Sequence, residues 1–440
     1  MKLRIINTVK NLLLVLLTLL MAALMVVIWF RTLSWEDIPV DSRFGQFYMR
    51  MAYGSASTFA LRTEQTPAAY PIEIAVRCGG RMVGAQNDES GVDALYEQYQ
   101  EVIREALSTA HGAAEAGDED AFLKALAGDC IFFRYHSALP VNLLFQWLAG
   151  TQDAPRDASV SAFLIAEDGT VWMRDSENGL LCFSADVDAA GWGKRLEDTI
   201  FQDCAFLGSR AAQSGLLPET LIFETRRQAF SAMETGMPAY LENNGVDSLQ
   251  TVLEAFEYNA AVGNYMDGET RIFVNNNSTL RVGADGKIAF RATSMTGGIE
   301  AYREGEATEE GELSLRVGVA QSVIEQIQKS YTTDASVYLC AVHQDEATGR
   351  FLLQFRYLCN GVPVMGEIGR CATVEFLQNT LVSAEISART FLASEELHYL
   401  VPCAQVLEMA GAEDVRVPIG YFEEDGVLRP RRYFEQAELR

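Results

Sequence analysis

The N-terminal segment Leu12–Phe30 constrains the architecture most, because Thr18 is the only polar residue in this apolar run. A helix rises 1.5 Å per residue, so the run spans roughly 28 Å, about the thickness of a hydrocarbon core. Trp29 lies where aromatic side chains mark the membrane interface. The run therefore predicts a transmembrane helix.

The charges that flank this run predict its orientation. Lys2, Arg4 and Lys10 precede it, whereas Arg31 is the only basic residue that follows before the first acidic residues. Because basic residues accumulate on the cytoplasmic side, we expect residues 1–10 in the cytoplasm, a signal anchor over residues 11–31, and the bulk of the chain outside the cell. Cleavage as a signal peptide is the alternative, although no small-residue cleavage site follows the run.

The formal net charge of −25 excludes one class of partner. Binding to nucleic acid requires clustered lysine and arginine side chains that neutralise phosphates. An acidic chain is also repelled by anionic membrane surfaces. We therefore expect no nucleic-acid partner, and membrane contact only through residues 11–31.

Beyond the anchor, short alternating runs are interrupted by single helical patterns. Residues 71–78 (PIEIAVRC) alternate as a strand does, and Asp93–Ala110 carries apolar residues at helical spacing. Turn pairs such as Asp285-Gly286 and Gln378-Asn379 separate alternating runs, which is typical of hairpins. This pattern predicts an α+β fold of antiparallel sheets with interspersed helices behind the transmembrane helix.

A charged, proline-containing stretch, TQDAPRDAS, suggests a domain boundary near residue 153. We expect an N-terminal domain over residues 40–153, a middle domain over 154–265 and a C-terminal domain over 266–440. Further helices are expected at residues 196–204, 246–256, 317–327 and 402–410.

The stretch IFVNNNSTLRVGADGKIAFRA, residues 272–292, contains glycosylation-like triplets and an Asp-Gly pair. Asparagine tolerates left-handed backbone geometry, so a cluster of asparagines suits a strand junction. The stretch lacks the twelve-residue calcium-loop pattern with its terminal glutamate. We interpret it as successive hairpins.

Few residues in the chain suggest catalysis. His111, His136, His343 and His398 lack zinc-site spacing, so we expect His136 to pack among aromatic rings and His343 to be half-buried in a sheet. No nucleophile elbow or phosphate loop is present. The eight cysteines form no CxxC pair and mostly lie in apolar runs, which predicts reduced, buried thiols: Cys78, Cys130, Cys182, Cys204, Cys340, Cys359, Cys371 and Cys403. We predict no catalytic residue, cofactor or metal site.

Several segments resemble the YycH family of single-pass extracytoplasmic proteins. DCIFFRYHSALPVNLLFQWL is similar to that family's strand followed by a proline-led helix. YLCNGVPVMG, with Asn360-Gly361 and Pro363, resembles a segment shared with the sister YycI proteins, and VPIGYFEEDGVLRPRRYF resembles their closing strand pair. The resemblance covers most of the chain, and all of its motifs are structural.

This resemblance implies a regulator of the WalK (YycG) sensor histidine kinase, with a YycI-like protein as a further partner. The regulator would act through contacts outside and within the membrane. Ala22 and Ala23 are the small-residue pair that would allow close helix approach in the bilayer. Two other classes stay open: an anchored envelope hydrolase, which predicts a cleft with convergent carboxylates of raised pKa, and a secreted binding protein.

Overall fold

The computed structural model describes residues 67–436, except 152, 176–178, 198–200, 209–215, 224–228, 244, 260, 276, 302–311, 346 and 401–414. Contacts divide the chain into residues 1–63 and 64–440, and all described residues belong to the second unit. The expected anchor over residues 11–31 and the expected helix over 402–410 lie outside the described residues. Within the described part of the chain, no helix combines the length and apolar character that crossing a bilayer requires.

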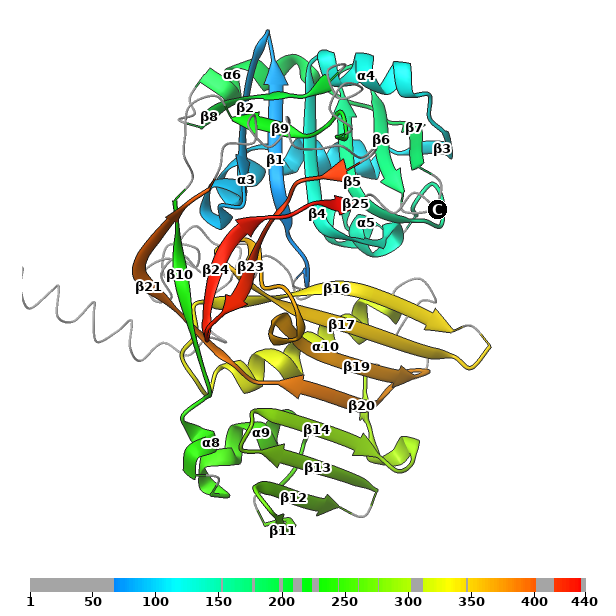
Figure 1. Ribbon diagram of the computed structural model, residues 1–440. Coiled ribbons are helices and arrows are strands. Elements are labelled where there is room, and N and C mark those ends of the chain that lie inside the picture. The colour runs from blue at the N-terminus through cyan, green and yellow to red at the C-terminus, as the bar shows by residue number, and fades with distance from the viewer. Residues whose placement is uncertain are drawn as a thin grey trace, which may run out of the picture. The chain divides into compact units, whose positions relative to one another are not determined.

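A nine-stranded antiparallel sheet forms the first half of the described chain (Figure 1). Its spatial order is β3-β7-β6-β5-β4-β1-β2-β8-β9. The strands are β1 (Pro71–Cys78), β2 (Arg81–Gln86), β3 (His111–Ala116), β4 (Cys130–Pro140), β5 (Ser159–Ala166), β6 (Thr170–Asp175), β7 (Gly179–Ser184), β8 (Gln202–Phe206) and β9 (Leu221–Phe223). The helices of this half are α3 (Glu89–Ser108), α4 (Glu119–Ala127), α5 (Val141–Ala149), η3 (Ala189–Gly191) and α6 (Trp192–Glu197).

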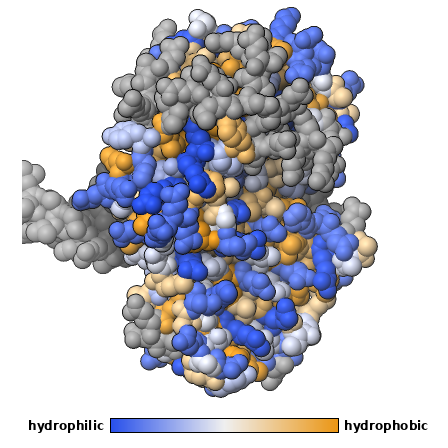
Figure 2. All heavy atoms as spheres, viewed as in Figure 1, coloured by the Kyte–Doolittle hydropathy of each residue, from blue (hydrophilic) through white to orange (hydrophobic). Residues whose placement is uncertain are grey.

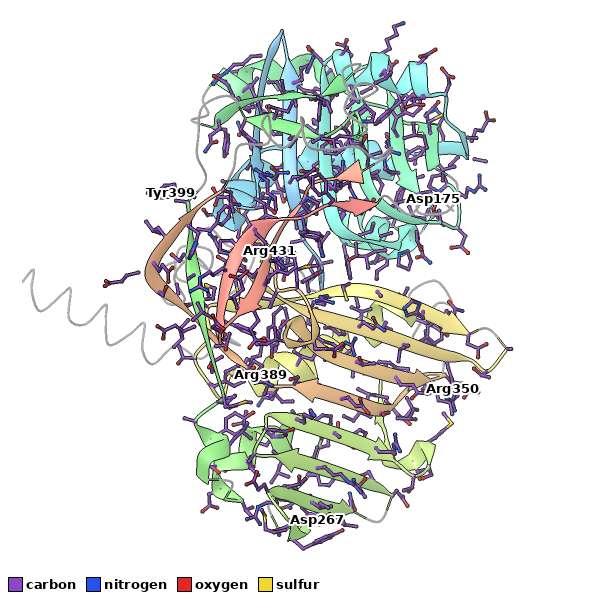
Figure 3. The ribbon with its side chains drawn as sticks, in the orientation of Figure 1. Asp175, Asp267, Arg350, Arg389, Tyr399 and Arg431 are labelled. Carbon is purple, nitrogen blue, oxygen red and sulfur yellow. The ribbon has the colours of Figure 1, made fainter. Side chains whose placement is uncertain are left out.

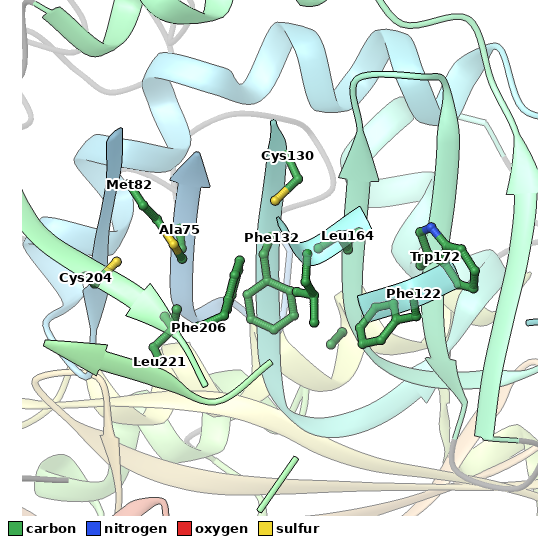
Figure 4. Close-up of a cluster of buried hydrophobic side chains, with 12 residues drawn as sticks. Ala75, Met82, Phe122, Cys130, Phe132, Leu164, Trp172, Cys204, Phe206 and Leu221 are labelled. Atoms are coloured by element: carbon green, nitrogen blue, oxygen red, sulfur yellow. The ribbon is translucent and has the colours of Figure 1, made fainter. Parts of the chain in front are cut away.

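Both faces of this sheet are covered, which explains why its central strands are apolar at nearly every position. On one face, α5 packs Phe145 against Phe163 of β5, and α3 contacts α5 and β1. On the other face, Phe132 of β4 packs edge-on against Phe206 of β8, and Phe122 of α4 packs against Trp172 of β6. Figure 4 shows this second cluster.

A ten-stranded sheet forms most of the second half, in the order β11-β12-β13-β14-β20-β19-β17-β16, with β15 paired to β20 and β18 to β17. Its strands are β11 (Gly263–Asp267), β12 (Thr270–Asn275), β13 (Ser278–Gly283), β14 (Lys287–Ala292), β15 (Ile299–Glu300), β16 (Ala335–Asp345), β17 (Arg350–Cys359), β18 (Val362–Pro363), β19 (Arg370–Leu377) and β20 (Thr380–Ser387). The helices here are α8 (Tyr240–Asn243), η5 (Asp247–Leu249), α9 (Gln250–Ala255), η6 (Met295–Gly297), α10 (Glu312–Gln328) and η7 (Glu367–Gly369).

Helices α9 and α10 contact each other, and α10 lies against β19 and β20. Phe256, which follows α9, stacks on Phe290 of β14 with ring centroids 5.0 Å apart. The strands alternate between buried and more exposed positions, as in the sequence Arg350 to Tyr357. This alternation is typical of an antiparallel sheet with a single packed face.

A four-stranded sheet joins distant parts of the chain in the order β21-β10-β24-β23. Its strands are β10 (Ala229–Gly236), β21 (Thr390–Tyr399), β23 (Ile419–Glu424) and β24 (Val427–Arg432). Two further strands, β22 (Val415–Arg416) and β25 (Glu435–Gln436), pair with each other. Strand β10, from the middle of the sequence, thus pairs with strands close to its end.

The structure confirms the α+β class with mostly antiparallel sheets, and it confirms several predicted hairpins. Asn275, the first of the three asparagines, ends β12 and pairs with Ser278 at the start of β13, as expected of a strand junction. Gly286, after β13, has φ +84°, the left-handed geometry expected of an Asp-Gly turn. The helices expected at residues 246–256 and 317–327 are present as η5 with α9, and as α10.

Two expectations differ from the structure. The boundary expected near residue 153 does not separate two sheets, because Arg134 of β4 pairs with Ala162 of β5 across it. The charged proline-containing stretch is a connection within one sheet. The helix expected at residues 196–204 is wrong, since α6 ends at Glu197 and β8 begins at Gln202. Residues 202–206 instead form β8, which pairs with β2 and β9, so strand pairing prevails over the helical spacing of the sequence.

The two halves meet near the start of α3. A Cβ on Gly361, in the Asn-Gly turn between β17 and β18, would lie only 3.2 Å from the backbone nitrogen of Glu89. His136 of β4 packs edge-on against Tyr338 of β16, with ring centroids 5.4 Å apart. The segment Asn360-Gly361 is therefore a close-packed turn, which explains its need for glycine.

Candidate interaction surfaces

Strand β21 is an edge strand with large exposed apolar side chains. It pairs with β10, and no other described strand pairs with it. Leu397 and Tyr399 are 54% and 63% exposed, and Leu392 is 44% exposed. Figure 3 shows Tyr399 at the far end of this strand. An exposed edge strand with apolar side chains can bind another polypeptide by strand pairing and apolar contact.

The covered and open parts of this edge can be distinguished. Phe391 receives a hydrogen bond from the Asp334 backbone nitrogen at 2.7 Å, and the Ala393 nitrogen donates to the Asp334 carboxylate at 2.8 Å. The first four residues of β21 are therefore covered by the residue directly before β16, Asp334. The half that carries Leu397 and Tyr399 has no such cover among the described residues.

Strand β11 is a second exposed edge, at the end of the ten-stranded sheet. All five of its residues are exposed. Tyr265 and Met266 are 55% and 45% exposed, and Val274 of the neighbouring β12 is 43% exposed. Figure 2 shows hydrophilic side chains interleaved with scattered hydrophobic ones on the face that it displays. Large exposed apolar side chains are therefore prominent on the edge strands β21 and β11.

The nine-stranded sheet contains a buried ionic network. Arg134 Nε lies 2.6 Å from Glu73 Oε1, and Arg134 Nη2 lies 3.2 Å from Glu219 Oε1. Arg174 binds Glu219 through two nitrogens, at 2.5 and 3.0 Å. Gln86 donates to the second oxygen of Glu73 at 2.7 Å. Glu73, Arg134 and Glu219 are each at most 5% exposed.

Register places the two arginines in one row of the sheet. Arg134 pairs with Ala162, and Ala162 pairs with Arg174. The small Ala162 side chain leaves room for Glu219 to bridge the guanidinium groups on either side. Burial disfavours the charged form of Glu219, but Arg174 and Arg134 outweigh it and lower the pKa of this carboxyl. A carboxylate held in this way is a structural ion, not a proton donor.

A second acidic residue, Glu89, has a raised pKa, in contrast to the lowered pKa of Glu219. Burial, Asp93 and Asp88 raise the pKa of Glu89, at the first turn of α3, to about 7. The three residues line a recess with Tyr70 and Gly361. Asp88 accepts a hydrogen bond from Gly91 and thereby caps α3. Glu89 is thus the described carboxyl that comes nearest to what the hydrolase alternative requires.

Glu89 makes stability depend on pH. The unfolded carboxyl titrates near 4.5 and the folded one near 7, so the folded chain retains a proton over this window that the unfolded chain has lost. Stability therefore falls as pH rises from about 4.5 to 7 and then levels off. Glu89→Gln is expected to raise the free energy of unfolding at pH 8 by about 1–3 kcal/mol and to leave it unchanged at pH 4.

Urea unfolding at both pH values measures this effect. Glu105→Gln, at an exposed position of the same helix, is the control and should change neither value. If Glu89→Gln and Glu105→Gln had the same free energy of unfolding at pH 8, the raised pKa of Glu89 would be contradicted.

The histidines do not converge on one site. His111 and His343 are exposed, so the expectation that His343 is half-buried is wrong; it lies near the free end of the β16–β17 hairpin, where packing is absent. His136 packs against an aromatic ring as expected. His398 Nε2 lies 3.1 Å from Glu396 Oε1.

The seven described cysteines form no disulfide bond with one another; four of them are buried, whereas Cys78, Cys182 and Cys340 are only partly buried. Burial raises the pKa of Cys130, Cys204 and Cys371 to about 12, mostly by excluding water. Such thiols are poor nucleophiles and poor metal ligands. Among the described residues, no group of three histidine, cysteine or acidic side chains could hold a metal ion. Ala22 and Ala23 lie outside the described residues.

Sequence reasoning missed the buried network. A signal existed for three of its members, because Glu73, Arg134 and Arg174 interrupt apolar strand runs, where a charge requires a buried partner. Glu219 follows Leu217-Pro218 in a connection, and nothing in its sequence context marks it.

No protein-family model matches the chain, and no curated protein matches it. Among solved structures, it is similar to the crystal structure of YycH from Bacillus subtilis, with a TM-score of 0.49 and 14% sequence identity. The similarity covers 84% of this chain and 94% of that chain.

Proposed function

We propose that this chain is a membrane-anchored extracytoplasmic regulatory protein that modulates a two-component sensor histidine kinase controlling cell-wall homeostasis. The observation that carries the proposal is the open half of β21, where Leu397 and Tyr399 are exposed on an edge that no other described strand covers. The family resemblance of the sequence motifs supports the choice of a kinase as partner.

An edge strand with apolar side chains suits recognition by strand addition. Backbone groups of the edge supply hydrogen bonds, and side chains such as Leu397 and Tyr399 supply anchors. Tyrosine is enriched among residues that dominate binding free energy. This chemistry fits a protein partner better than a small substrate.

The anchor contributes a second contact in the proposal. Residues 11–31 would cross the membrane once, with residues 1–10 in the cytoplasm and the bulk outside. Ala22 and Ala23 would allow close packing against a kinase helix. Sharing one membrane raises the effective concentration of both partners, so a weak contact outside the membrane suffices.

The double variant Leu397→Asp/Tyr399→Asp tests the surface. Charges on the edge disfavour burial against a partner, so we expect the affinity for the kinase to fall more than tenfold. The measurement is kinase-dependent reporter output at matched levels of membrane-inserted protein. Tyr265→Asp, on the other exposed edge, is the control and should behave as wild type. Loss of regulation in the control but not in the double variant would exclude β21 as the contact.

The hydrolase alternative depends on Glu89, whose pKa of about 7 suits a general acid. It requires that Glu89→Gln abolish hydrolysis of a wall polymer by the purified chain.

The secreted-binding-protein alternative requires a mature N-terminus beyond residue 31. N-terminal sequencing of the membrane and medium fractions distinguishes it.

A further inference from the structure

One face of the ten-stranded sheet carries two exposed arginines, on the neighbouring strands β13 and β14. Phe290 of β14 stacks on Phe256 beside α9, so the Phe290 side chain points to the packed face. Because successive side chains of a strand point to opposite faces, Ala289 and Arg291 point to the other face. Arg281 of β13 pairs with Ala289 and therefore lies on that face as well. Arg281 and Arg291 are both exposed.

The two arginines are diagonal neighbours without a described counter-ion. Arg281 pairs with Ala289, two residues before Arg291, and residues in this relation have Cα atoms roughly 7–8 Å apart. Neither arginine side chain forms a hydrogen bond or an ion pair with any residue that the structure describes, and this includes Glu385, which pairs with Ala289 from the other side. Two positive charges held this close attract a group that carries negative charge.

Apolar side chains lie beside the arginines on the same face. Arg281 pairs with Ile272 of β12, and Ile272 pairs with Tyr265 of the edge strand β11. Val274, two residues after Ile272, points to this face too. Tyr265 and Val274 are 55% and 43% exposed. Protein interfaces are enriched in tyrosine and arginine. Tyr265, Val274, Arg281 and Arg291 together form a surface that we call the β11–β14 face.

The composition of the β11–β14 face selects the kind of partner. A polyphosphate would match the arginines but leave Tyr265 and Val274 in water. A second copy of this chain, bound through the same face, would place arginines against arginines, which costs free energy. A polypeptide with acidic and apolar side chains matches both parts, because carboxylates bind guanidinium groups through paired hydrogen bonds and apolar side chains cover tyrosine and valine.

We propose that the β11–β14 face binds an acidic polypeptide segment of a partner protein. The carboxylates of that segment pair with Arg281 and Arg291, and its apolar side chains pack on Tyr265 and Val274. The β11–β14 face belongs to a different sheet from β21, so this contact is separate from the one proposed for the kinase. Variants that weaken binding of the acidic segment therefore leave regulation through β21 unchanged.

Fluorescence anisotropy of labelled peptides with the full-length chain in detergent tests the proposal. One peptide combines glutamate and leucine residues, and a second has glutamine at every glutamate position. We expect saturable binding of the acidic peptide, which weakens as salt concentration rises. The glutamine peptide is expected to bind about tenfold more weakly, because it lacks charge-assisted hydrogen bonds. Absence of saturable binding by the acidic peptide, or equal binding of the two peptides, overturns the proposal.

Inorganic polyphosphate, used as a competitor, distinguishes an acidic polypeptide from an anionic polymer. Polyphosphate lacks apolar groups, so at an equal concentration of negative charge we expect it to leave the acidic peptide bound. Displacement of the peptide at that concentration overturns the proposal in favour of an anionic polymer.

The double variant Arg281→Gln/Arg291→Gln assigns the charged part of the face. It is expected to weaken binding of the acidic peptide about tenfold or more and to reduce its salt dependence. Arg350→Gln is the matched control. Arg350 points to the same face from β17, but it is paired with Glu375 at 3.0 Å, so its variant should bind as wild type. Equal affinity of the double variant and the control also overturns the proposal.

Discussion

Glu219→Ala is expected to lower the free energy of unfolding by about 3–5 kcal/mol, because it removes the carboxylate shared by the buried Arg134 guanidinium and the largely buried Arg174 guanidinium. Glu219 is completely buried, and Arg134 and Arg174 both lie within 3.2 Å of it. Desolvation of a guanidinium is tolerated only when a carboxylate compensates it.

Urea unfolding followed by tryptophan fluorescence measures the effect, since Trp172 lies in β6 of the same sheet and Trp192 begins α6 beside it. Asp203→Ala is the control. It breaks the pair between Arg81 and Asp203, whose side chains are 45% and 68% exposed, and should cost about 0–1 kcal/mol. A Glu219→Ala cost no larger than that of the control would show that the network does not stabilise the sheet.

Replacing Leu12–Phe30 with an unrelated apolar span is expected to remove most of the effect on the kinase while preserving insertion. The proposal places one of the two contacts in the bilayer, where packing of small residues decides helix association. Bulky replacements at Ala22 and Ala23 alone should produce the same loss, because they block close approach at a single position.

Kinase-dependent reporter output, with membrane-inserted protein matched by immunoblot, measures this loss. Bulky replacements at Leu16 and Leu17, in the same run, are the control, since they add little to side chains that are already large. Full regulation by the swapped chain would show that the anchor serves only to raise local concentration.

The sequence predicted hairpins well because local chemistry determines them. Asp285-Gly286 and Gln378-Asn379 require positive φ at one residue, and the structure has φ +84° at Gly286 and +55° at Gln378. Alternation on either side then determines register, since a slip by one residue would expose the core face.

Long-range pairing could not be predicted in this way. Strand β10 pairs with β21 and β24, more than 150 residues later in the chain, and local propensity carries no information about such partners. The stretch at residues 151–159 resembles a linker by composition, yet β4 and β5 pair across it. Composition identifies exposed chain, and it does not distinguish a loop within a sheet from a link between domains.

The candidate surfaces could not be predicted from the sequence either. Leu397 and Tyr399 belong to the sequence TFLASEELHY, in which apolar and polar residues do not alternate, and only the sheet order reveals that β21 is an edge strand. Asn87, His136 and Arg416, which line one recess, come from three separate segments. No spacing rule connects them.

Site-specific photo-crosslinking in native membranes tests the central claim most directly. A photoreactive residue at position 397 or 399 of the full-length chain should form an adduct with a membrane sensor histidine kinase. The same residue at Asp425, at the exposed tip of the β23–β24 hairpin, should form none. The claim is contradicted if neither β21 position yields a kinase adduct and the purified full-length chain hydrolyses a wall polymer.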